Sequence, residues 1–228
     1  MTSKFGKIYL IPTPIGNMSD ITHRALEILN EVDLIACEDT RHSGRFLKQF
    51  NIKKKLVSYH NFNELSRSQE LKSTLEQGHS IAVITDAGSP GISDPAYRIA
   101  RMAIDNGFEL SALPGANALI PALTASGLPT DRFFFEGFLP NKTIARKKRL
   151  EKLKEFEHTI VFYESPHRIK KSLDDILFVF GNREICIARE ISKKFEEYLR
   201  GNVSDIIEQL ESKTVKGEIV LVVKGKKD

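Results

Sequence analysis

The stretch Ile81-Ala-Val-Ile-Thr-Asp-Ala-Gly-Ser-Pro-Gly-Ile-Ser-Asp-Pro95 indicates the fold, because an apolar strand runs directly into a rigid loop of small residues. Its first half is typical of a buried strand, whereas its glycines and prolines exclude a helix before Ala96. Asp86 therefore lies at the carboxyl end of a strand, which is the edge where open α/β sheets bind ligands. The alternative is an ordinary strand-to-helix turn, with Asp94 as the cap of a helix that begins near Pro95.

The composition is that of a globular protein with a sizeable core. The chain has 228 residues, of which 41% are hydrophobic and 28% charged, and a net charge of +4. Cys37 and Cys186 lie in apolar runs without metal-ligand spacing, so we expect buried thiols in a reducing compartment and no metal site. No apolar stretch approaches the roughly 18 residues of a membrane span, and the start lacks the features of a signal peptide. We therefore expect a cytoplasmic protein with no membrane partner.

Two α/β domains are expected from the rhythm of apolar strands and amphipathic helices. In the first, residues 1–127, strands are expected at 8–11, 34–37, 56–59, 81–85 and 109–112, and helices at 22–31, 41–50, 64–76, 95–106 and 116–126. In the second, residues 128–228, strands are expected at 133–138, 159–164, 184–188, 195–200 and 218–223, and helices at 143–156, 166–180 and 203–211. Strict alternation predicts a mostly parallel N-terminal sheet, and hairpin-compatible strands predict a mixed C-terminal sheet.

Three loops of the first domain share one design. Pro12-Thr-Pro-Ile-Gly-Asn17 follows the first strand, the Asp86 loop follows the fourth, and Leu113-Pro-Gly-Ala-Asn-Ala118 follows the fifth. Small residues let backbone groups approach a ligand closely. The loops lack GxGxxG and GxxxxGK[ST], which disfavours a Rossmann dinucleotide site and a P-loop. They predict a pocket for a small polar molecule that is held by backbone groups.

Motifs in these loops and in the second domain resemble the tetrapyrrole methylase superfamily. The motifs are TPIGN (13–17), EDTR (38–41), ITDAGSPGISDP (84–95), PGANALIPALTASGL (114–128), FFFEGFLP (133–140), YESPHR (163–168) and KFEE (194–197). Within the superfamily they resemble the enzymes that methylate the ribose 2′-hydroxyl of a cytidine in the decoding centre of 16S ribosomal RNA, in the small subunit. The resemblance covers residues 8–223 and implies two α/β domains, a cleft between them for S-adenosylmethionine, and a homodimer.

Carried over position by position, the resemblance implies a set of cofactor-binding residues. They are Pro14, Ile15, Gly16, Asp86, Ala87, Gly88, Ser89, Leu113, Ala116, Asn117, Ala118 and Tyr163. The N-terminal domain would supply the substrate side and part of this site, and Tyr163 in the C-terminal domain would close the cleft. Asn117 departs from the Ser or Thr that is more common in relatives, but it keeps a hydrogen-bonding side chain.

Methyl transfer to a ribose hydroxyl needs an aligned acceptor and a base that removes the hydroxyl proton. The candidate catalytic residues are Glu38, Arg41 and His60, with Asp39 and Asp86 as further candidate bases near strand ends. A structural Glu38–Arg41 ion pair is the favoured alternative for those two residues. His60 suits a base by its pKa range, and its alternative is a surface residue or hydrogen-bonding anchor.

Contacts with RNA are expected from basic and aromatic side chains. The segment from Lys142 to Lys154 contains seven basic residues and one acidic residue. This composition indicates either a solvated helix face or a phosphate-binding surface. The candidate phosphate contacts are Arg41, Arg45, Lys142, Arg146, Lys147, Lys148, Arg149, Arg168 and Lys194. Tyr59 or Phe62 would stack a base or pack in the protein.

Two rival functions stay open. One is C-methylation of a tetrapyrrole precursor, which a lysine-rich helix disfavours. The other is a non-catalytic RNA-binding module in ribosome assembly, which three intact small-residue loops disfavour.

Overall fold

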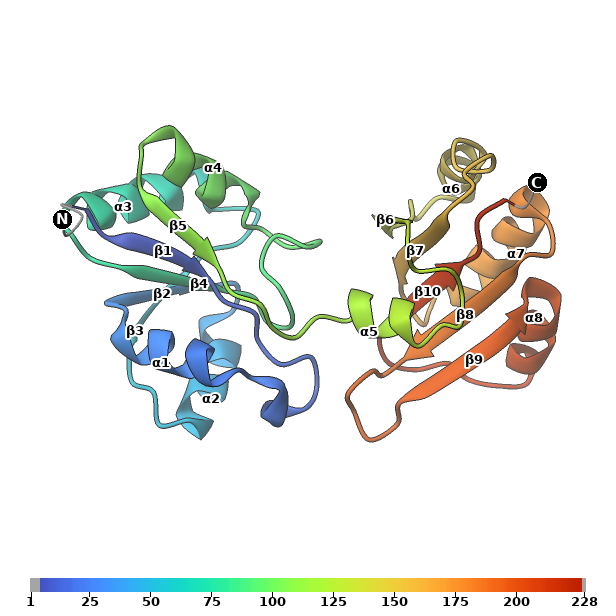
Figure 1. Ribbon diagram of the computed structural model, residues 1–228, viewed down its shortest axis with the longest axis horizontal. Helices are drawn as coiled ribbons and strands as arrows, with labels where there is room; N and C mark the ends of the chain where they lie inside the picture. Colours follow the sequence, from blue (N-terminus) through green and yellow to red (C-terminus); the bar gives the residue numbers. More distant parts are fainter. Residues whose placement is uncertain (1–4, 227–228) are drawn as a thin grey trace. The chain divides into compact units, whose positions relative to one another are not determined.

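The computed structural model describes residues 5–226, which form two compact units (Figure 1). The units divide between Asn117 and Ala118, whereas the sequence places the joint at residue 127. Helix α5 (Leu119–Thr124) accounts for the difference, because it packs against β10 (Ile219–Val223) of the second unit. The Arg200 guanidinium also donates to the carbonyl of Ala125, at 2.6 Å from Nη2.

The first unit contains a five-stranded, fully parallel sheet, which confirms the mostly parallel sheet predicted from the sequence. Its strands, in the spatial order β3-β2-β4-β1-β5, are β1 (Lys7–Leu10), β2 (Leu34–Cys37), β3 (Lys55–Ser58), β4 (Ile81–Ile84) and β5 (Glu109–Ala112). The helices are η1 (Met18–Asp20), α1 (His23–Glu31), α2 (Thr40–Gln49), α3 (Glu64–Glu76) and α4 (Tyr97–Asp105). Sequence analysis did not predict η1.

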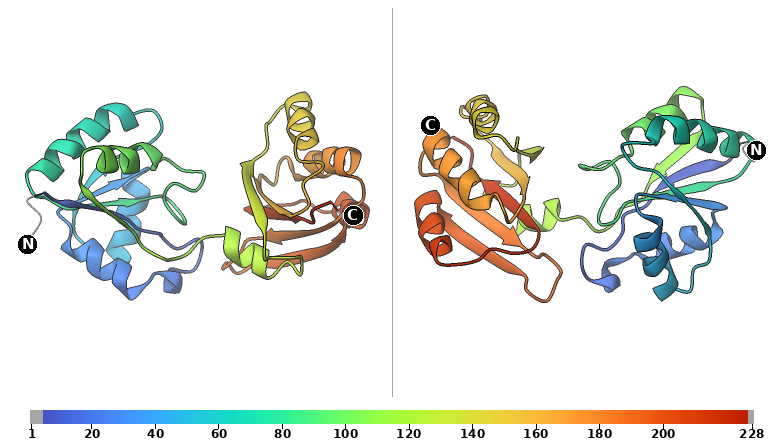
Figure 2. Two further views of the ribbon diagram at one scale, coloured as in Figure 1. Left: turned by 45° about the horizontal axis from the view of Figure 1, so that its top comes forward. Right: turned by 180° about the vertical axis from the view of Figure 1, so that it is seen from behind.

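Helices cover both faces of this sheet (Figures 1 and 2). Helices α1 and α2 bury apolar residues such as Leu29 and Phe46 in one core, whereas α3 and α4 bury Leu75 and Ile99 in the other. Because both faces are covered, the central strands β2 and β4 are buried at every position. This explains why they appear in the sequence as short continuous apolar runs.

The parallel register brings the carboxyl ends of the strands to one edge. Cys37 of β2 pairs with Ile84 of β4 and with Ser58 of β3, and Leu10 of β1 pairs with Val83. The residues that follow these strand ends must therefore emerge side by side, and they include most of the predicted site.

The second unit contains a mixed sheet in the order β6-β7-β10-β8-β9, as the sequence predicted. Strands β6 (Phe133–Phe138) and β7 (Thr159–Glu164) are parallel, while β8 (Glu184–Arg189), β9 (Glu197–Asn202) and β10 pair antiparallel. Helices α6 (Thr143–Glu151), α7 (Ile169–Phe180) and α8 (Val203–Glu211) pack over one core, to which β10 contributes alternate residues. Figure 2 shows α7 and α8 side by side on the sheet.

Several expected boundaries shift. Helix α4 begins at Tyr97 with Ala96 as its N-cap and without a capping side chain, which excludes the alternative in which Asp94 caps this helix. Strand β9 begins at residue 197, because residues 190–196 form a tight connection in which Glu190 and Ser192 have φ values of 51° and 67°. Within residues 5–226, no helix has the length and hydropathy needed to cross a membrane.

Candidate functional site

Two of the three predicted loops are joined directly by backbone hydrogen bonds. The Thr13 N–H donates to the Gly88 carbonyl and the Gly88 N–H donates to the Thr13 carbonyl, both at 2.9 Å. The Thr13 hydroxyl donates to the Thr85 carbonyl at 3.0 Å and is buried with it. The loops after β1 and β4 therefore form one rigid body.

The third loop packs onto the other two through glycine. The Ser89 hydroxyl donates to the Ala116 carbonyl at 3.3 Å. A Cβ on Gly115 would lie 2.8 Å from Cβ of Pro12, which is closer than real carbon contacts allow. Gly88 has φ of 81°, a conformation that favours glycine. The three loops thus converge, as the sequence predicted, and their glycines are what lets them do so.

The predicted cofactor-binding residues fall into both units. Those of the first unit lie in the interlocked loops, where Gly16, Asp86 and Ala87 are exposed and Pro14 and Leu113 are buried. Ala118 and Tyr163 belong to the second unit. Tyr163 is half-buried in β7, and its ring lies 4.9 Å from that of Phe135.

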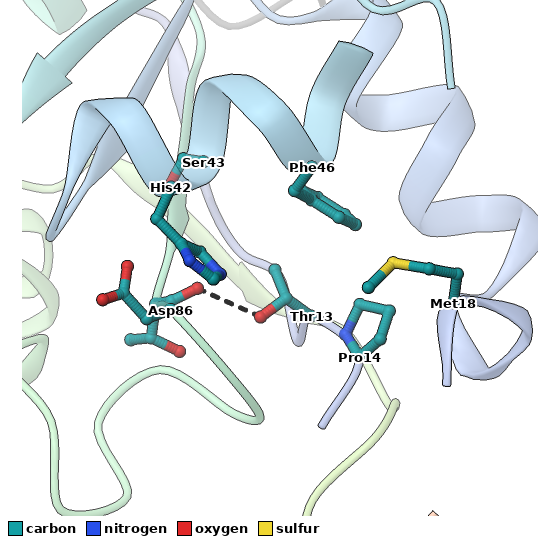
Figure 3. Close-up of a pocket in the computed structure, with 8 residues that line it drawn as sticks. Thr13, Pro14, Met18, His42, Ser43, Phe46 and Asp86 are labelled. Atoms are coloured by element: carbon teal, nitrogen blue, oxygen red, sulfur yellow. Dashed lines mark hydrogen bonds between the residues drawn. The ribbon is translucent and has the colours of Figure 1, made fainter. Parts of the chain in front are cut away.

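A small pocket opens beside the joined loops (Figure 3). Its lining comes from the loops after β1 and β4, from η1, and from the first two turns of α2: Thr13, Pro14, Met18, His42, Ser43, Phe46, Thr85 and Asp86. In Figure 3, Phe46 and Met18 form one apolar end, while His42 and Asp86 lie at the other. Sequence analysis missed the contribution of α2, although His42 and Phe46 stand one helical turn apart.

Three carboxyl groups interact at the strand edge: Glu38 after β2, Asp86 after β4, and Asp94 in the loop that follows. Burial, followed by the charge of Asp86, raises the pKa of Glu38, although the Asp86 backbone N–H donates to this carboxylate. Burial, followed by the charges of Glu38 and Asp86, raises the pKa of Asp94 from 3.8 to about 7. A carboxyl group that is half-protonated near neutral pH can accept or donate a proton there.

The sequence did not identify Asp94 as a member of this group, because its position before a helix suggested only a helix cap. No local sequence pattern predicts that Asp94 interacts with Glu38 and Asp86. Glu38 follows a different strand, β2, and Asp86 lies at the other end of the loop that contains Asp94. Within residues 5–226, no set of three or more His, Cys, Asp or Glu side chains is arranged to hold a metal ion.

The predicted Glu38–Arg41 ion pair is wrong. Arg41 pairs with Asp39 instead, at 3.1 Å between Nη2 and Oδ2. Asp39 also caps α2 by accepting from the backbone N–H groups of Arg41 and His42. Hydrogen bonds from the Arg41 side chain and backbone lower the pKa of Asp39 to about 2, so this residue does not suit the role of a base.

His60 lies in a tight turn after β3. Its backbone N–H donates to Asn63 Oδ1 at 2.8 Å, and its Nε2 lies 3.4 Å from Asn63 Nδ2. It follows β3, whose last residue Ser58 pairs with Cys37, the residue before Glu38, so the His60 turn lies at the same edge of the sheet. Tyr59 is only 1% exposed, so of the two roles that the sequence left open for it the structure shows packing. It lies in the core that α3 and α4 form with the sheet.

In the second unit, the YESPHR motif builds a buried ion-pair network. Glu164, which is 3% exposed, accepts from Ser172 at 2.5 Å and from Arg168 Nη2 at 2.5 Å. Arg168 also donates to the Leu139 carbonyl at 3.3 Å and to the Asn141 side chain. Its prediction as a phosphate contact is therefore wrong, because its donors are used inside the unit.

Some basic side chains of the segment from Lys142 to Lys154, the basic run, are buried or form ion pairs within the unit. Arg146 is 2% exposed and pairs with Asp175 at 2.6 Å, so its prediction as a phosphate contact is wrong as well. Lys147 pairs with Asp175 at 3.5 Å, and Arg149 pairs with Glu136 at 2.5 Å. The exposed basic residues of the run that have no ion pair within the described part of the chain are Lys142, Lys148 and Lys152. The helix is thus neither a plain solvated face nor a uniform cationic surface.

Comparison with known sequences gives matches over nearly the whole chain. Residues 7–207 match the family described as Tetrapyrrole (Corrin/Porphyrin) Methylases. The chain is 47% identical over 220 residues to Ribosomal RNA small subunit methyltransferase I of Halalkalibacterium halodurans, covering 96% of this chain and 76% of that protein. It is 47% identical over 229 residues to the protein of the same name from Haemophilus influenzae, covering 99% and 81%.

Solved structures share the fold at low sequence identity. Cobalt precorrin-4 methyltransferase aligns with a TM-score of 0.71 at 15% identity and covers 96% of this chain and 94% of that chain. Uroporphyrin-III-C-methyltransferase from Thermus thermophilus aligns with a TM-score of 0.62 at 20% identity, covering 96% and 92%. At such identities the likeness establishes the fold and nothing about the substrate.

Proposed function

Since this chain belongs to the tetrapyrrole methylase family, we propose that it methylates a cytidine ribose 2′-hydroxyl in 16S ribosomal RNA, near the decoding centre, with S-adenosylmethionine as donor. The observation that carries the proposal is the 47% identity to relatives named for small-subunit ribosomal RNA, over 96% or more of the chain. The two tetrapyrrole-modifying enzymes reported above share the fold at 20% and 15% identity, which carries no argument about the substrate.

The interlocked loops fit S-adenosylmethionine. Their glycines and alanines expose backbone groups, and the exposed Asp86 carboxylate suits the ammonium group of a methionine moiety. The residues that would hold the cofactor in the first unit are Pro14, Ile15, Gly16, Asp86, Ala87, Gly88, Ser89, Leu113, Ala116 and Asn117. When bound, the cofactor supplies a methyl group on a positively charged sulfur, which needs no metal.

The acidic strand edge supplies proton transfer in this proposal. The acceptor hydroxyl must lose its proton as the new bond forms, and a base with a raised pKa does this most effectively near neutral pH. We assign this role to Glu38, with Asp94, whose carboxyl group interacts electrostatically with it, to share the proton. Arg41 exposes 84% of its side chain, which suits contact with an RNA phosphate better than contact with the reacting atoms.

The remaining parts of the proposal rest on the resemblance to the family. They are the roles of Ala118 and Tyr163 in cofactor binding, the assignment of the substrate side to the N-terminal domain, a homodimer, and a cytoplasmic location. The β7 position of Tyr163, within a cluster with Phe135 and Phe138, is compatible with a rigid contact surface.

The decisive experiment measures methyl transfer directly. The purified protein is incubated with tritiated S-adenosylmethionine and small ribosomal subunits from a strain that lacks the corresponding gene. We expect label in the RNA that resists alkaline hydrolysis at the modified linkage, because a 2′-O-methyl group blocks cleavage. A parallel reaction with uroporphyrinogen III should stay unlabelled. Label in the porphyrinogen and none in RNA would overturn the proposal.

Glu38→Gln tests the assignment of the base. We expect it to lower kcat by about 100-fold or more while cofactor affinity stays close to that of the wild type. Glu31→Gln, at the exposed end of α1, is the matched control and should leave kcat unchanged. An unchanged kcat in Glu38→Gln would remove Glu38 from the reaction.

A further inference from the structure

Phe62 is the most exposed large hydrophobic side chain among residues 5–226. It is 98% exposed, whereas its neighbour Tyr59 is 1% exposed. The sequence leaves open whether these rings stack on a base or pack in the core, and the structure separates them. Tyr59 packs in the protein, and Phe62 is exposed to solvent. An aromatic ring held in water is unfavourable unless a partner covers it.

The turn that carries Phe62 is braced. The Asn63 N–H donates to the His60 carbonyl at 2.9 Å, and the Asn63 side chain both accepts from His60 N–H and donates to the Ser58 carbonyl. The rings of His60 and Phe62 lie edge to face, with centroids 6.0 Å apart. Phe62 therefore lies on a turn with its own hydrogen-bond network. Binding of a partner would cost little further ordering of this backbone.

Phe62 also stands beside the proposed catalytic edge. Its turn follows β3, whose last residue Ser58 pairs with Cys37 of β2, the residue before Glu38. His60, two residues from Phe62, acts electrostatically on the Glu38 carboxylate. If the ribose of the target nucleotide reaches Glu38, the base of the next nucleotide would thus lie near Phe62.

Exposed cations lie on the helix between these two strand ends. Arg41 and Arg45 occupy positions one turn apart on α2, which packs against β3, and both are exposed. Proteins that bind single-stranded nucleic acid combine such cations with aromatic rings on which bases stack.

We propose that Phe62 is a stacking platform for an unpaired RNA base next to the target nucleotide, with the adjoining phosphates held by Arg41 and Arg45. This inference rests on the proposed function, from which the RNA substrate comes. The exposed cations of α2 favour RNA as the occupant, and a contact between copies of this chain is an outcome of the test below.

The test measures binding of a short single-stranded RNA that carries the target cytidine and a 2-aminopurine on its 3′ side. Stacking on an aromatic ring quenches 2-aminopurine fluorescence. We expect Phe62→Ala to weaken RNA binding by about 5- to 100-fold and to abolish the quenching, and Phe62→Trp to restore both. Phe62→Leu should restore neither, because it keeps apolar area without a ring face. Phe178→Ala, at a ring 73% exposed on the second unit, is the matched control and should bind as the wild type does.

Kinetics distinguish stacking from a structural role. In Phe62→Ala we expect KM for RNA to rise while kcat at saturating RNA and cofactor affinity stay within about twofold, since only binding of the substrate is lost. RNA binding equal to that of the wild type would overturn the inference. A change in sedimentation from dimer to monomer would also overturn it, because Phe62 would then be a contact between copies.

The binding assay needs no catalysis, so the two proposals fail separately. If the wild type binds the RNA with quenching but transfers no methyl group, the proposed function fails and the stacking site stands. If it methylates RNA and Phe62→Ala binds normally, only the stacking site fails.

Discussion

The two units differ in how the carboxylates described above are neutralised. In the second unit, buried Asp175 meets Arg146 and Lys147, and buried Glu164 meets Arg168 and the Ser172 hydroxyl. In the first unit, Glu38, Asp86 and Asp94 interact with one another, and burial followed by like charges raises the pKa values of Glu38 and Asp94. Compensated charges hold a structure in place, whereas uncompensated charges reduce stability and make a proton easy to move.

This contrast also separates two kinds of family motif. YESPHR is as distinctive in the sequence as ITDAGSPGISDP, yet its Glu164 and Arg168 are consumed by a buried network. The ITDAGSPGISDP loop instead leaves its Asp86 carboxylate exposed beside two other acids. A motif can therefore identify a family through a structural element just as well as through its chemistry.

The largest effect should come from breaking the compensated network. Arg146→Met keeps most of the side-chain volume but leaves Asp175 buried, with Lys147 as its remaining ion-pair partner among the described residues. We expect the free energy of unfolding, measured by urea denaturation, to fall by about 3 to 5 kcal/mol. The control Arg45→Met, on an exposed part of α2, should change it by less than about 0.5 kcal/mol.

A second substitution sharpens this test. Arg146→Met combined with Asp175→Leu removes both charges, and we expect it to regain most of the lost stability, because no unpaired carboxylate stays buried. If the single variant loses less than about 1 kcal/mol, the network does not stabilise the second unit as argued.

Asp86→Ala should have the next largest effect, on ligand binding and not on folding. The substitution removes one charge-assisted contact to the cofactor, so we expect S-adenosylmethionine affinity, measured by calorimetry, to fall by about 10- to 100-fold. The free energy of unfolding should stay the same or rise slightly, because a like charge beside Glu38 is lost. Asp131→Ala, an exposed carboxylate in the second unit, is the control. Unchanged affinity in Asp86→Ala would take Asp86 out of the proposed site.

The acidic edge should also give a pH dependence of stability. The pKa of Asp94 is 3.8 in an ordinary setting and about 7 in the folded protein. The folded state therefore holds its proton more tightly, and this stabilisation is complete below pH 3.8 and is lost as the pH rises through 7. We expect Asp94→Asn to remove much of that decrease and to be more stable than the wild type at pH 8 by about 1 to 3 kcal/mol.

Denaturation of wild type and variant at several pH values checks this sign. The difference in free energy between the two should grow from pH 4 to pH 8, and the exposed control Asp131→Asn should show no such trend. A difference that does not vary with pH would mean that Asp94 titrates as an ordinary carboxyl group.

The smallest effect belongs to the exposed part of the basic run. Changing Lys142, Lys148 and Lys152 together to Glu should leave stability within about 0.5 kcal/mol per site, since none of them forms an ion pair within the described residues. If these lysines contact phosphates, the slope of RNA affinity against salt should decrease by about 0.7 for each lost contact. An unaltered slope would identify them as solvated side chains only.

Much of the fold follows from the residues themselves. The alternation of short apolar runs with amphipathic segments predicted both sheets and, for β2, β5, β6, β7, α3 and α8, their bounds without error. Boundaries near Pro and Gly were less accurate. The sequence predicted that α5 begins at residue 116 and β9 at residue 195. In the structure they begin at Leu119 and Glu197, because the preceding loops extend further. Backbone turns of this kind depend on hydrogen bonds to distant segments, which no local pattern contains.

Charge partners were the hardest feature to predict. A run of seven basic residues looks uniform in the sequence. In the structure Arg146 is buried against Asp175 of α7, and the partly exposed Arg149 pairs with Glu136 of β6. Arg41 forms its ion pair with Asp39 and not with Glu38, because the Asp39 side chain caps the helix in which Arg41 lies.

By itself, the sequence determined the family, the two α/β units and the three small-residue loops, because hydrophobic periodicity and glycine–proline chemistry act over a few neighbouring residues. Only the tertiary structure decided which acids share the edge with Glu38, which guanidinium groups stay exposed, and that Phe62 and not Tyr59 presents its ring to solvent. Burial and electrostatic interaction depend on distances between residues that are far apart in the chain, and those distances exist only once the sheet has formed.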